Sequence, residues 1–235
     1  MTTPEVMSAL AALGSEATKK VLSRHGAREP FFGVKIGDMK PLAKRLKGRQ
    51  ELAMELYATG NGDAQYLAGM VADGRKMTRA DLDLWARTAS WHMISGTTVP
   101  WVAHEHADGF AAAREWIDSA DAKVAVAGWA TLSALVATVA DDKLPLDALR
   151  SLLGRVEAAL PAAPDRVRYG MNAFVIATGT YVAPLAEEAL ALARRMGRVE
   201  VDMGETACQV PVAAEYIVKS RRGAAVAAKR KTVRC

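Results

Sequence analysis

The sequence is poor in cysteine, in strand signals and in long apolar runs. Its 235 residues include two cysteines, Cys208 and Cys235, too few for a disulfide framework and typical of a reduced intracellular protein. The most apolar stretch, residues 124–140, is rich in Ala, Gly, Ser and Thr, which predicts a buried helix rather than a membrane span. The N-terminus lacks the basic residues and the unbroken apolar run of a secretory signal. We therefore expect a cytoplasmic protein without a membrane partner.

The common signatures of cofactor and nucleophile chemistry are also missing. The sequence contains no phosphate-binding loop, no nucleotide-binding glycine motif and no nucleophile elbow. His104 and His106 flank Glu105, but on a helix the two rings point about 200° apart, and no cysteine or second carboxylate stands at ligand spacing. We expect no metal and no cofactor. Cys208 has no histidine near it in sequence, which favours a buried structural thiol over a nucleophile.

Helix signals dominate what is present. Apolar residues recur with helical spacing, and prolines stand at the starts of these segments or between them. Pairs of such segments recur at roughly 30 to 40 residues, which predicts an all-α solenoid, an α-α superhelix with a concave binding surface. We expect one domain over residues 1–218 and a basic tail over residues 219–235. The predicted helices cover residues 4–12, 15–24, 38–47, 50–59, 63–72, 79–94, 98–107, 110–118, 121–140, 146–159, 164–178, 184–196 and 208–219.

Positive charge is concentrated in two blocks. The net charge is +5, yet residues 219–235 hold seven basic side chains and no acidic one, so that residues 1–218 hold 24 basic and 26 acidic side chains. Residues 19–49 hold ten basic and two acidic side chains. Within that block Lys40, Lys44 and Lys47 share one helical face, a stripe that suits a phosphate backbone.

Each block also has a plainer interpretation. The lysines of the first block fit the solvated face of an amphipathic helix. The tail fits a disordered end that keeps the protein soluble. Two basic blocks in one chain together favour a polyanionic partner.

Four segments carry a resemblance to a known family. They are PFFGV at residues 30–34, MKPLAK at 39–44, LAMELYATGNGDAQYLAGMVAD at 52–73 and DLDLWARTASWHM at 81–93. In this order and spacing, over about residues 15–200, the chain resembles the AlkD-like DNA alkylation repair family. The resemblance implies a HEAT-like repeat solenoid that holds duplex DNA in a positively charged concave groove and removes cationic alkylated purines.

The catalytic carboxylate of that family has no counterpart in this sequence. In the family it stands four residues after a tryptophan, on one helix, and stabilises the sugar cation that forms as the base leaves. The tryptophan matches Trp91, and Ser95 stands at the carboxylate position. Losing an ion pair at ~4 Å in an effective dielectric of about 20 removes about 4 kcal/mol, roughly a thousandfold in rate. Whether the protein releases a base is therefore left open.

Two further positions depart from the family pattern. The family's Trp-x-Arg-Arg-like run corresponds to apolar residues near Val126 and Ala127, before Trp129. The aromatic residue of a later helix is matched only approximately, by Phe174 or by Tyr169 one turn earlier.

We expect DNA to be bound mainly through its phosphates. Arg87, Trp91 and Ser95, spaced four residues apart, would share one helical face, although Trp91 equally fits a packing role in the core. Asp202 and Glu205, in a predicted loop, offer an alternative carboxylate. A different class of function, a non-catalytic scaffold for a protein partner, stays open. The candidate DNA contacts are Lys40, Lys44, Lys47, Arg87, Trp91, Arg166, Arg168, Lys229, Arg230 and Lys231.

Overall fold

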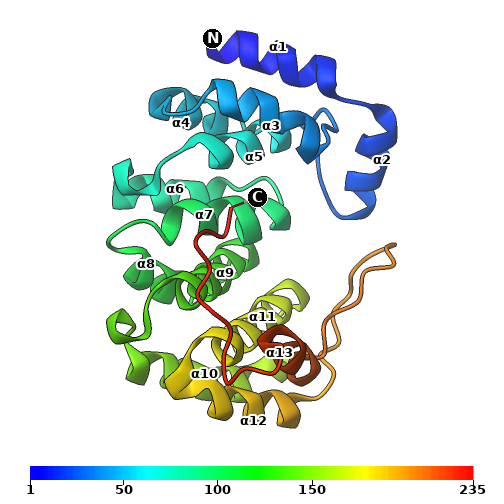
Figure 1. The fold of residues 1–235 in the computed structure, drawn as a ribbon. Coiled ribbons are helices and arrows are strands. Elements are labelled where there is room, and N and C mark those ends of the chain that lie inside the picture. Colours follow the sequence, from blue (N-terminus) through cyan, green and yellow to red (C-terminus); the bar gives the residue numbers. More distant parts are fainter. Residues whose placement is uncertain (235) are drawn as a thin grey trace.

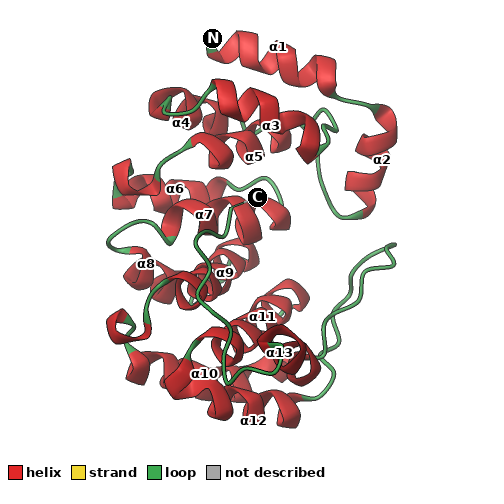
Figure 2. Cartoon of the chain, viewed as in Figure 1, coloured by secondary structure: helices red, strands yellow, loops and turns green. Residues whose placement is uncertain are grey.

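The computed structural model describes residues 1–234 and is helical throughout, with no strand in that range (Figure 2). Cys235 lies outside the described residues. The thirteen α-helices are α1 (Thr3–Leu13), α2 (Glu16–Arg24), α3 (Ile36–Arg45), α4 (Gln50–Ala58), α5 (Gly62–Val71), α6 (Arg79–Thr88), α7 (Val99–Ala103), α8 (Gly109–Trp116), α9 (Ala122–Thr138), α10 (Leu146–Ala159), α11 (Asp165–Tyr181), α12 (Ala186–Met196) and α13 (Ala213–Arg221).

The helices stack as successive hairpins. Figure 1 shows α4, α6, α8 and α10 along one side of the stack, with α7, α9 and α11 on the other. Helix α9 is the centre: it packs against α8, α11 and α7, and its residues from Val124 to Trp129 are all buried, as its apolar sequence predicts. Two apolar cores meet at α8 and α9, one formed mainly by α1 to α7 and the other by α9 to α13.

The predicted helix over residues 79–94 is interrupted, and Gln65 provides the reason. Helix α6 ends at Thr88, and the chain turns before it resumes as a π-helical turn, Ile94–Thr98, that continues into α7. The fully buried Gln65 donates through Nε2 to the carbonyl of Thr88 (2.9 Å) and accepts from the N–H of Ser90 (2.9 Å). One side-chain amide thus replaces helical hydrogen bonds at the break.

The PFFGV turn is held in place by a buried carboxylate. Asp63, at the start of α5, accepts hydrogen bonds from the N–H groups of Phe32 (2.6 Å), Gly33 (2.9 Å) and Val34 (3.1 Å). Gly33 has a φ of +77°, and a Cβ there would lie 2.8 Å from the carbonyl oxygen of Ser15. The turn therefore requires glycine, and it joins α2 to α5.

The basic C-terminal segment lies against the solenoid. Helix α13 extends to Arg221, whose buried guanidinium donates to the carbonyls of Gly179 and Ala186 and pairs with Glu187. The chain then turns at Arg222, which has a φ of +51°, and residues 222–234 run back along the stack (Figure 1, red).

Within the described residues, no single helix has the length and hydropathy to cross a membrane. One bent pair, Asp165–Tyr181 with Ala183–Met196, passes that test by length and composition only.

Candidate functional site

A cavity of about 620 Å³ opens on the side of the stack formed by α7, α9 and α11. Its walls come from segments far apart in the sequence: the end of α2, the π-helical turn, α9, α11, the loop after α12 and the C-terminal segment. Most of the lining is apolar, with a few polar groups, as in ligand sites of this size. The solenoid curvature thus gathers one site from nearly the whole chain.

Trp91 and His92 form one wall of the cavity. Their rings meet edge to face, with centroids 5.1 Å apart and planes at 72°. Trp91 is 7% exposed, and it also borders a smaller apolar cavity of about 240 Å³ between α2, α3 and α5. Trp91 therefore packs in the core and also borders the cavity, and its contact with DNA stays a prediction.

Arg166 and Tyr169 supply polar groups from α11. Both line the cavity, and Arg166 reaches the loop after α12 through a contact between Nη1 and the sulfur of Met203 (3.6 Å). Tyr169 is 38% exposed, whereas Phe174 is fully buried against Trp129. Of the two aromatic residues that the sequence offered on this helix, Tyr169 is the one at the cavity.

The arginine and histidine side chains that line the cavity are all basic residue types. They are Arg166, Arg230, His25 and His92, and no aspartate or glutamate of residues 1–234 borders the cavity. Asp202 and Glu205 are exposed on the loop after α12, and neither lines the cavity. A cavity with this lining attracts anions and offers no carboxylate to stabilise a sugar cation.

Ser95 lies beside the cavity rather than in it. Its side chain is fully buried, and Oγ donates to the carbonyl oxygen of Trp91 (3.4 Å). The next two residues, Gly96 and Thr97, line the cavity instead. The expectation that Arg87, Trp91 and Ser95 share one helical face is wrong, because the chain breaks after Thr88 and leaves Arg87 exposed on α6.

The other candidate cations are spread over the surface. Lys40 and Lys44 are exposed on α3, Lys47 lies beyond its end, and none of the three borders the cavity. Arg168 pairs with Asp165. Lys229 pairs with Asp141 (2.7 Å), so its charge is already matched, whereas Arg230 borders the cavity. Lys231 is exposed.

The loop over residues 197–212 spans part of the cavity mouth. Met203 lines the cavity, and a Cβ on Gly204 would lie 3.2 Å from the carbonyl oxygen of Arg24 at the end of α2. The loop therefore reaches from the second half of the stack to the first. Cys208 is exposed on this loop, which corrects the expectation of a buried thiol and also moves the predicted start of the last helix from residue 208 to Ala213.

The three residues considered for a metal site each have a different partner. His104 Nδ1 lies 2.9 Å from the carbonyl oxygen of Pro100, and His106 Nε2 lies 3.0 Å from that of Met77. Glu105 accepts from the N–H of Gly74 (2.9 Å) and pairs with Arg234 (2.6 Å).

Stability is expected to depend on the ionisation of His92. Burial, together with the charges of Arg166 and His25, lowers the pKa of His92 from 6.5 to about 4. Below pH 6.5 the unfolded chain binds a proton that the folded protein binds only near pH 4, so stability falls as the pH drops through that window. After allowance for partial exposure the loss is about 2 kcal/mol. His92→Gln should remove this part of the pH dependence.

Urea unfolding of both proteins at pH 7 and pH 4.5 measures this difference. The pKa of His104 is also lowered, chiefly by burial, but His104 is present in both proteins and cancels in the comparison. Equal pH dependence in the two proteins would show that His92 is protonated as readily in the folded state as in the unfolded chain.

Sequence reasoning did not assign several residues to the site, among them two histidines and a methionine of the cavity wall. His25 and Met203 stand in no motif, and no spacing relates them to Trp91, whereas His92 belongs to the segment over residues 81–93. His92 follows Trp91 directly, so its position beside a candidate site residue was the one available signal. His25 and Met203 reach the cavity through tertiary packing, which local patterns do not encode.

The chain is similar to known proteins over nearly its whole length. Two uncharacterized proteins, from Listeria innocua and Listeria monocytogenes, are each 32% identical over 218 residues, covering 90% of this chain and 94% of theirs. A solved structure is 37% identical with a TM-score of 0.90, and the match covers 100% of both chains. It is described as a member of a new family of proteins related to the HEAT-like repeat DNA glycosylases, with affinity for branched DNA structures. The predicted HEAT-like solenoid is thus confirmed.

A family model agrees with these similarities and with the four segments that carry the resemblance. The model for DNA alkylation repair enzymes matches residues 6–206, which include every helix from α2 to α12. Because this match spans well over half of the sequence, the chain belongs to the DNA alkylation repair enzyme family.

Proposed function

We propose that the protein binds branched DNA through its concave cavity, by phosphate and stacking contacts, and that it does not release alkylated bases. The observation that carries this proposal is the composition of the cavity wall: two arginines, two histidines and the exposed ring of Tyr169, with no carboxylate from the described residues. The solved relative at 37% identity and a TM-score of 0.90 has affinity for branched DNA, which favours the same class of ligand here.

Charge supports a nucleic-acid ligand. Arg166 and Arg230 face a cavity with low-dielectric walls, where positive potential is focused and phosphate is attracted. Phosphate contacts of this kind are independent of base sequence and weaken steeply as salt displaces them.

Shape and aromatic content favour DNA with an exposed base step over a continuous duplex. The bases of a continuous duplex are stacked on each other, whereas a branch point leaves terminal base pairs with free faces. Tyr169 is exposed at the cavity and provides a ring against which such a base can stack, an interaction worth about 1–3 kcal/mol per base. The loop that carries Met203 narrows the mouth between the two halves of the stack.

The chemistry of base release requires a negative charge that this cavity lacks. An alkylated purine leaves as a neutral base, and the positive charge develops on the sugar. Arginines along the wall would oppose that charge rather than stabilise it. We therefore infer that the family fold serves here for binding.

Paired substitutions on α11 test the binding proposal. Arg166→Ala is expected to weaken binding of a three-way DNA junction by about tenfold and to reduce the slope of log Kd against log salt by about 1, because one phosphate contact is lost. Arg168→Ala removes the same charge two residues further along α11, but its partner Asp165 already matches that charge. It should change the affinity less than twofold.

Fluorescence anisotropy with a labelled junction over a salt series gives both quantities. Equal effects of the two substitutions would contradict binding in the cavity. Failure of the unmodified chain to bind any DNA would favour the protein scaffold instead.

A further inference from the structure

The C-terminal segment forms an ordered connection along the stack. We name residues 222–234 the cationic strap. After α13 the chain turns back at Arg222 and Gly223, with φ values of +51° and +86°, and it crosses α9 to end near α7 (Figure 1). Val233 packs on the core of the first half, whereas α13 belongs to the core of the second half. The strap therefore joins the two halves directly.

Its middle part binds the last turns of α11 and α9. The N–H of Ala227 donates to the carbonyl oxygen of Thr180 (2.8 Å), in the last turn of α11. The N–H of Arg230 donates to the carbonyl oxygen of Ala137, and Lys229 Nζ donates to that of Val136, both at 2.8 Å. These carbonyls belong to the end of α9, which lacks intrahelical donors for its final residues.

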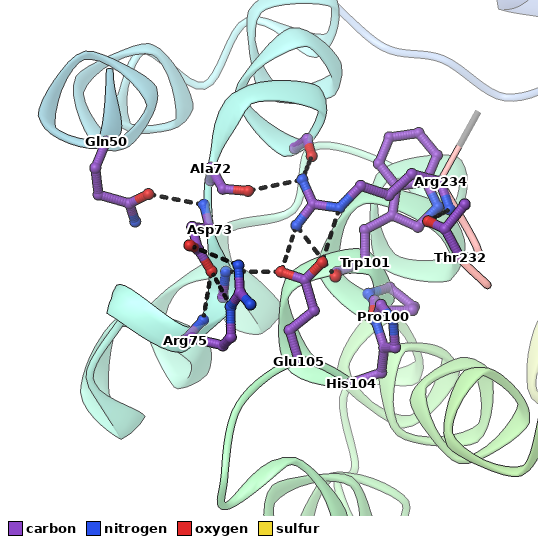
Figure 3. A network of polar contacts seen from close by, with 12 residues as sticks. Gln50, Ala72, Asp73, Arg75, Pro100, Trp101, His104, Glu105, Thr232 and Arg234 are labelled. Atoms are coloured by element: carbon purple, nitrogen blue, oxygen red, sulfur yellow. Dashed lines mark hydrogen bonds and ion pairs between the residues drawn. The ribbon is translucent and has the colours of Figure 1, made fainter. Parts of the chain in front are cut away.

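Arg234 makes the same kind of contact at two further helices (Figure 3). Its guanidinium donates to the carbonyl oxygens of Gly69 (2.8 Å) and Ala72 (2.6 Å) at the end of α5, and to that of Trp101 (3.4 Å) in α7. It also pairs with Glu105 (2.6 Å). The strap thus contacts the C-terminal ends of four helices, α5, α7, α9 and α11.

Without the strap this rim would be negative. A helix C-terminus carries about half a negative charge, and Glu105 and Asp141 stand at the same rim. Such an edge repels DNA phosphates. Lys229 and Arg234 neutralise it. Beyond the turn at Arg222, two further cations of the strap remain: Arg230, which borders the cavity, and Lys231, which is exposed. Neither forms an ion pair with any of the described residues.

We infer that the cationic strap is part of the DNA-binding surface: Arg230 and Lys231 contact phosphates at the rim of the cavity, and Arg234 is the residue that positions them. This inference rests on the proposed function. The backbone hydrogen bonds at Ala227 and Arg230 and the anchor at Arg234 hold the two cations in place before DNA arrives, which reduces the ordering cost of binding. A tail without such anchors would provide positive charge but would not fix the position of the two cations relative to the cavity.

Three proteins and a matched control test this inference on a three-way DNA junction. Arg230→Ala/Lys231→Ala removes the outward cations and leaves every anchor intact. Arg234→Gln removes the anchor and keeps both cations. Arg114→Ala/Arg194→Ala removes two exposed charges from the outer helices α8 and α12, as the control. Combining Arg234→Gln with Arg230→Ala/Lys231→Ala completes a double-mutant cycle.

The readouts are the junction affinity over a salt series and the thermal midpoint. Arg230→Ala/Lys231→Ala should weaken binding by about tenfold or more and reduce the salt slope by about 1.5 to 2, with an unchanged midpoint. Arg234→Gln should lower the midpoint by about 5 °C and weaken binding as well. In the combined protein, Arg234→Gln should add little further loss, because its effect on binding acts through the two cations. The control should retain at least half of the affinity.

Two results would overturn the inference. An unchanged salt slope in Arg230→Ala/Lys231→Ala, when the unmodified chain binds DNA, would mean that the strap only stabilises the fold. Additive losses in the double-mutant cycle would remove the positioning role of Arg234. If instead the unmodified chain, the control and all variants fail to bind the junction, the proposed function itself fails, and that outcome is distinct from the first two.

Discussion

Ser95→Asp is expected to lower the free energy of unfolding by about 3 kcal/mol or more and to yield no release of alkylated bases. The side chain at this position is fully buried, and its hydroxyl donates to the carbonyl oxygen of Trp91, which would repel a carboxylate. The new group would be desolvated without a cationic partner, at a position that does not line the cavity. Restoring the family's residue type at this position therefore does not restore its chemistry.

Two controls show whether the loss of stability comes from burying a charge at position 95. Ser95→Ala should cost less than about 1 kcal/mol, because it leaves no charge behind. Thr97→Asp places a carboxylate two residues on, where the side chain lines the cavity, and should stay within about 1 kcal/mol of the unmodified protein. Urea unfolding gives the stabilities, and release of bases from methylated DNA gives the activity. A stable Ser95→Asp protein that releases bases would contradict this account of the site.

Asp63→Ala is expected to destabilise the protein by about 3 to 5 kcal/mol. The carboxylate is 3% exposed and accepts from three consecutive backbone N–H groups, so its removal leaves three donors without acceptors. The turn at residues 31–34 would lose the group that joins it to α5. Desolvation raises the pKa of Asp63, which reduces the benefit of its charge but not the cost of losing all three acceptors.

Asp63→Asn and Asp38→Ala calibrate this result. Asparagine keeps one acceptor oxygen, so the free energy of unfolding of Asp63→Asn should lie between those of the unmodified protein and Asp63→Ala. Asp38 is exposed in the first turn of α3, and its replacement should cost less than about 1 kcal/mol. Chemical denaturation of the three proteins compares them directly. Similar stabilities for Asp63→Ala and Asp38→Ala would show that the turn does not depend on Asp63.

Local sequence patterns predict most helices because apolar residues recur with helical spacing and several helices begin at a side-chain cap. Helix α9 is apolar all round and is central, and α6 begins at a capping box formed by Thr78 and Asp81. The break after Thr88 could not be predicted in this way. It depends on the side chain of Gln65, 23 residues earlier, whose position is set by tertiary packing.

The candidate site could be predicted only in part. Trp91, Arg166 and Arg230 were candidates and do border the cavity, and the sequence narrowed the aromatic residue of α11 to two positions. The basic tail was recognised by composition, which reports charge but not conformation. Its order arises from free carbonyls at four helix ends, a feature that exists only once the stack has formed.

The most direct test of the account is a competition between branched and linear DNA for the unmodified chain. A labelled three-way junction is bound at near-physiological salt and displaced with an unlabelled junction or with a linear duplex of the same base composition. The account predicts that about tenfold more duplex than junction is needed for equal displacement. Equal displacement by the two competitors would contradict the claim that the cavity is adapted to branched DNA.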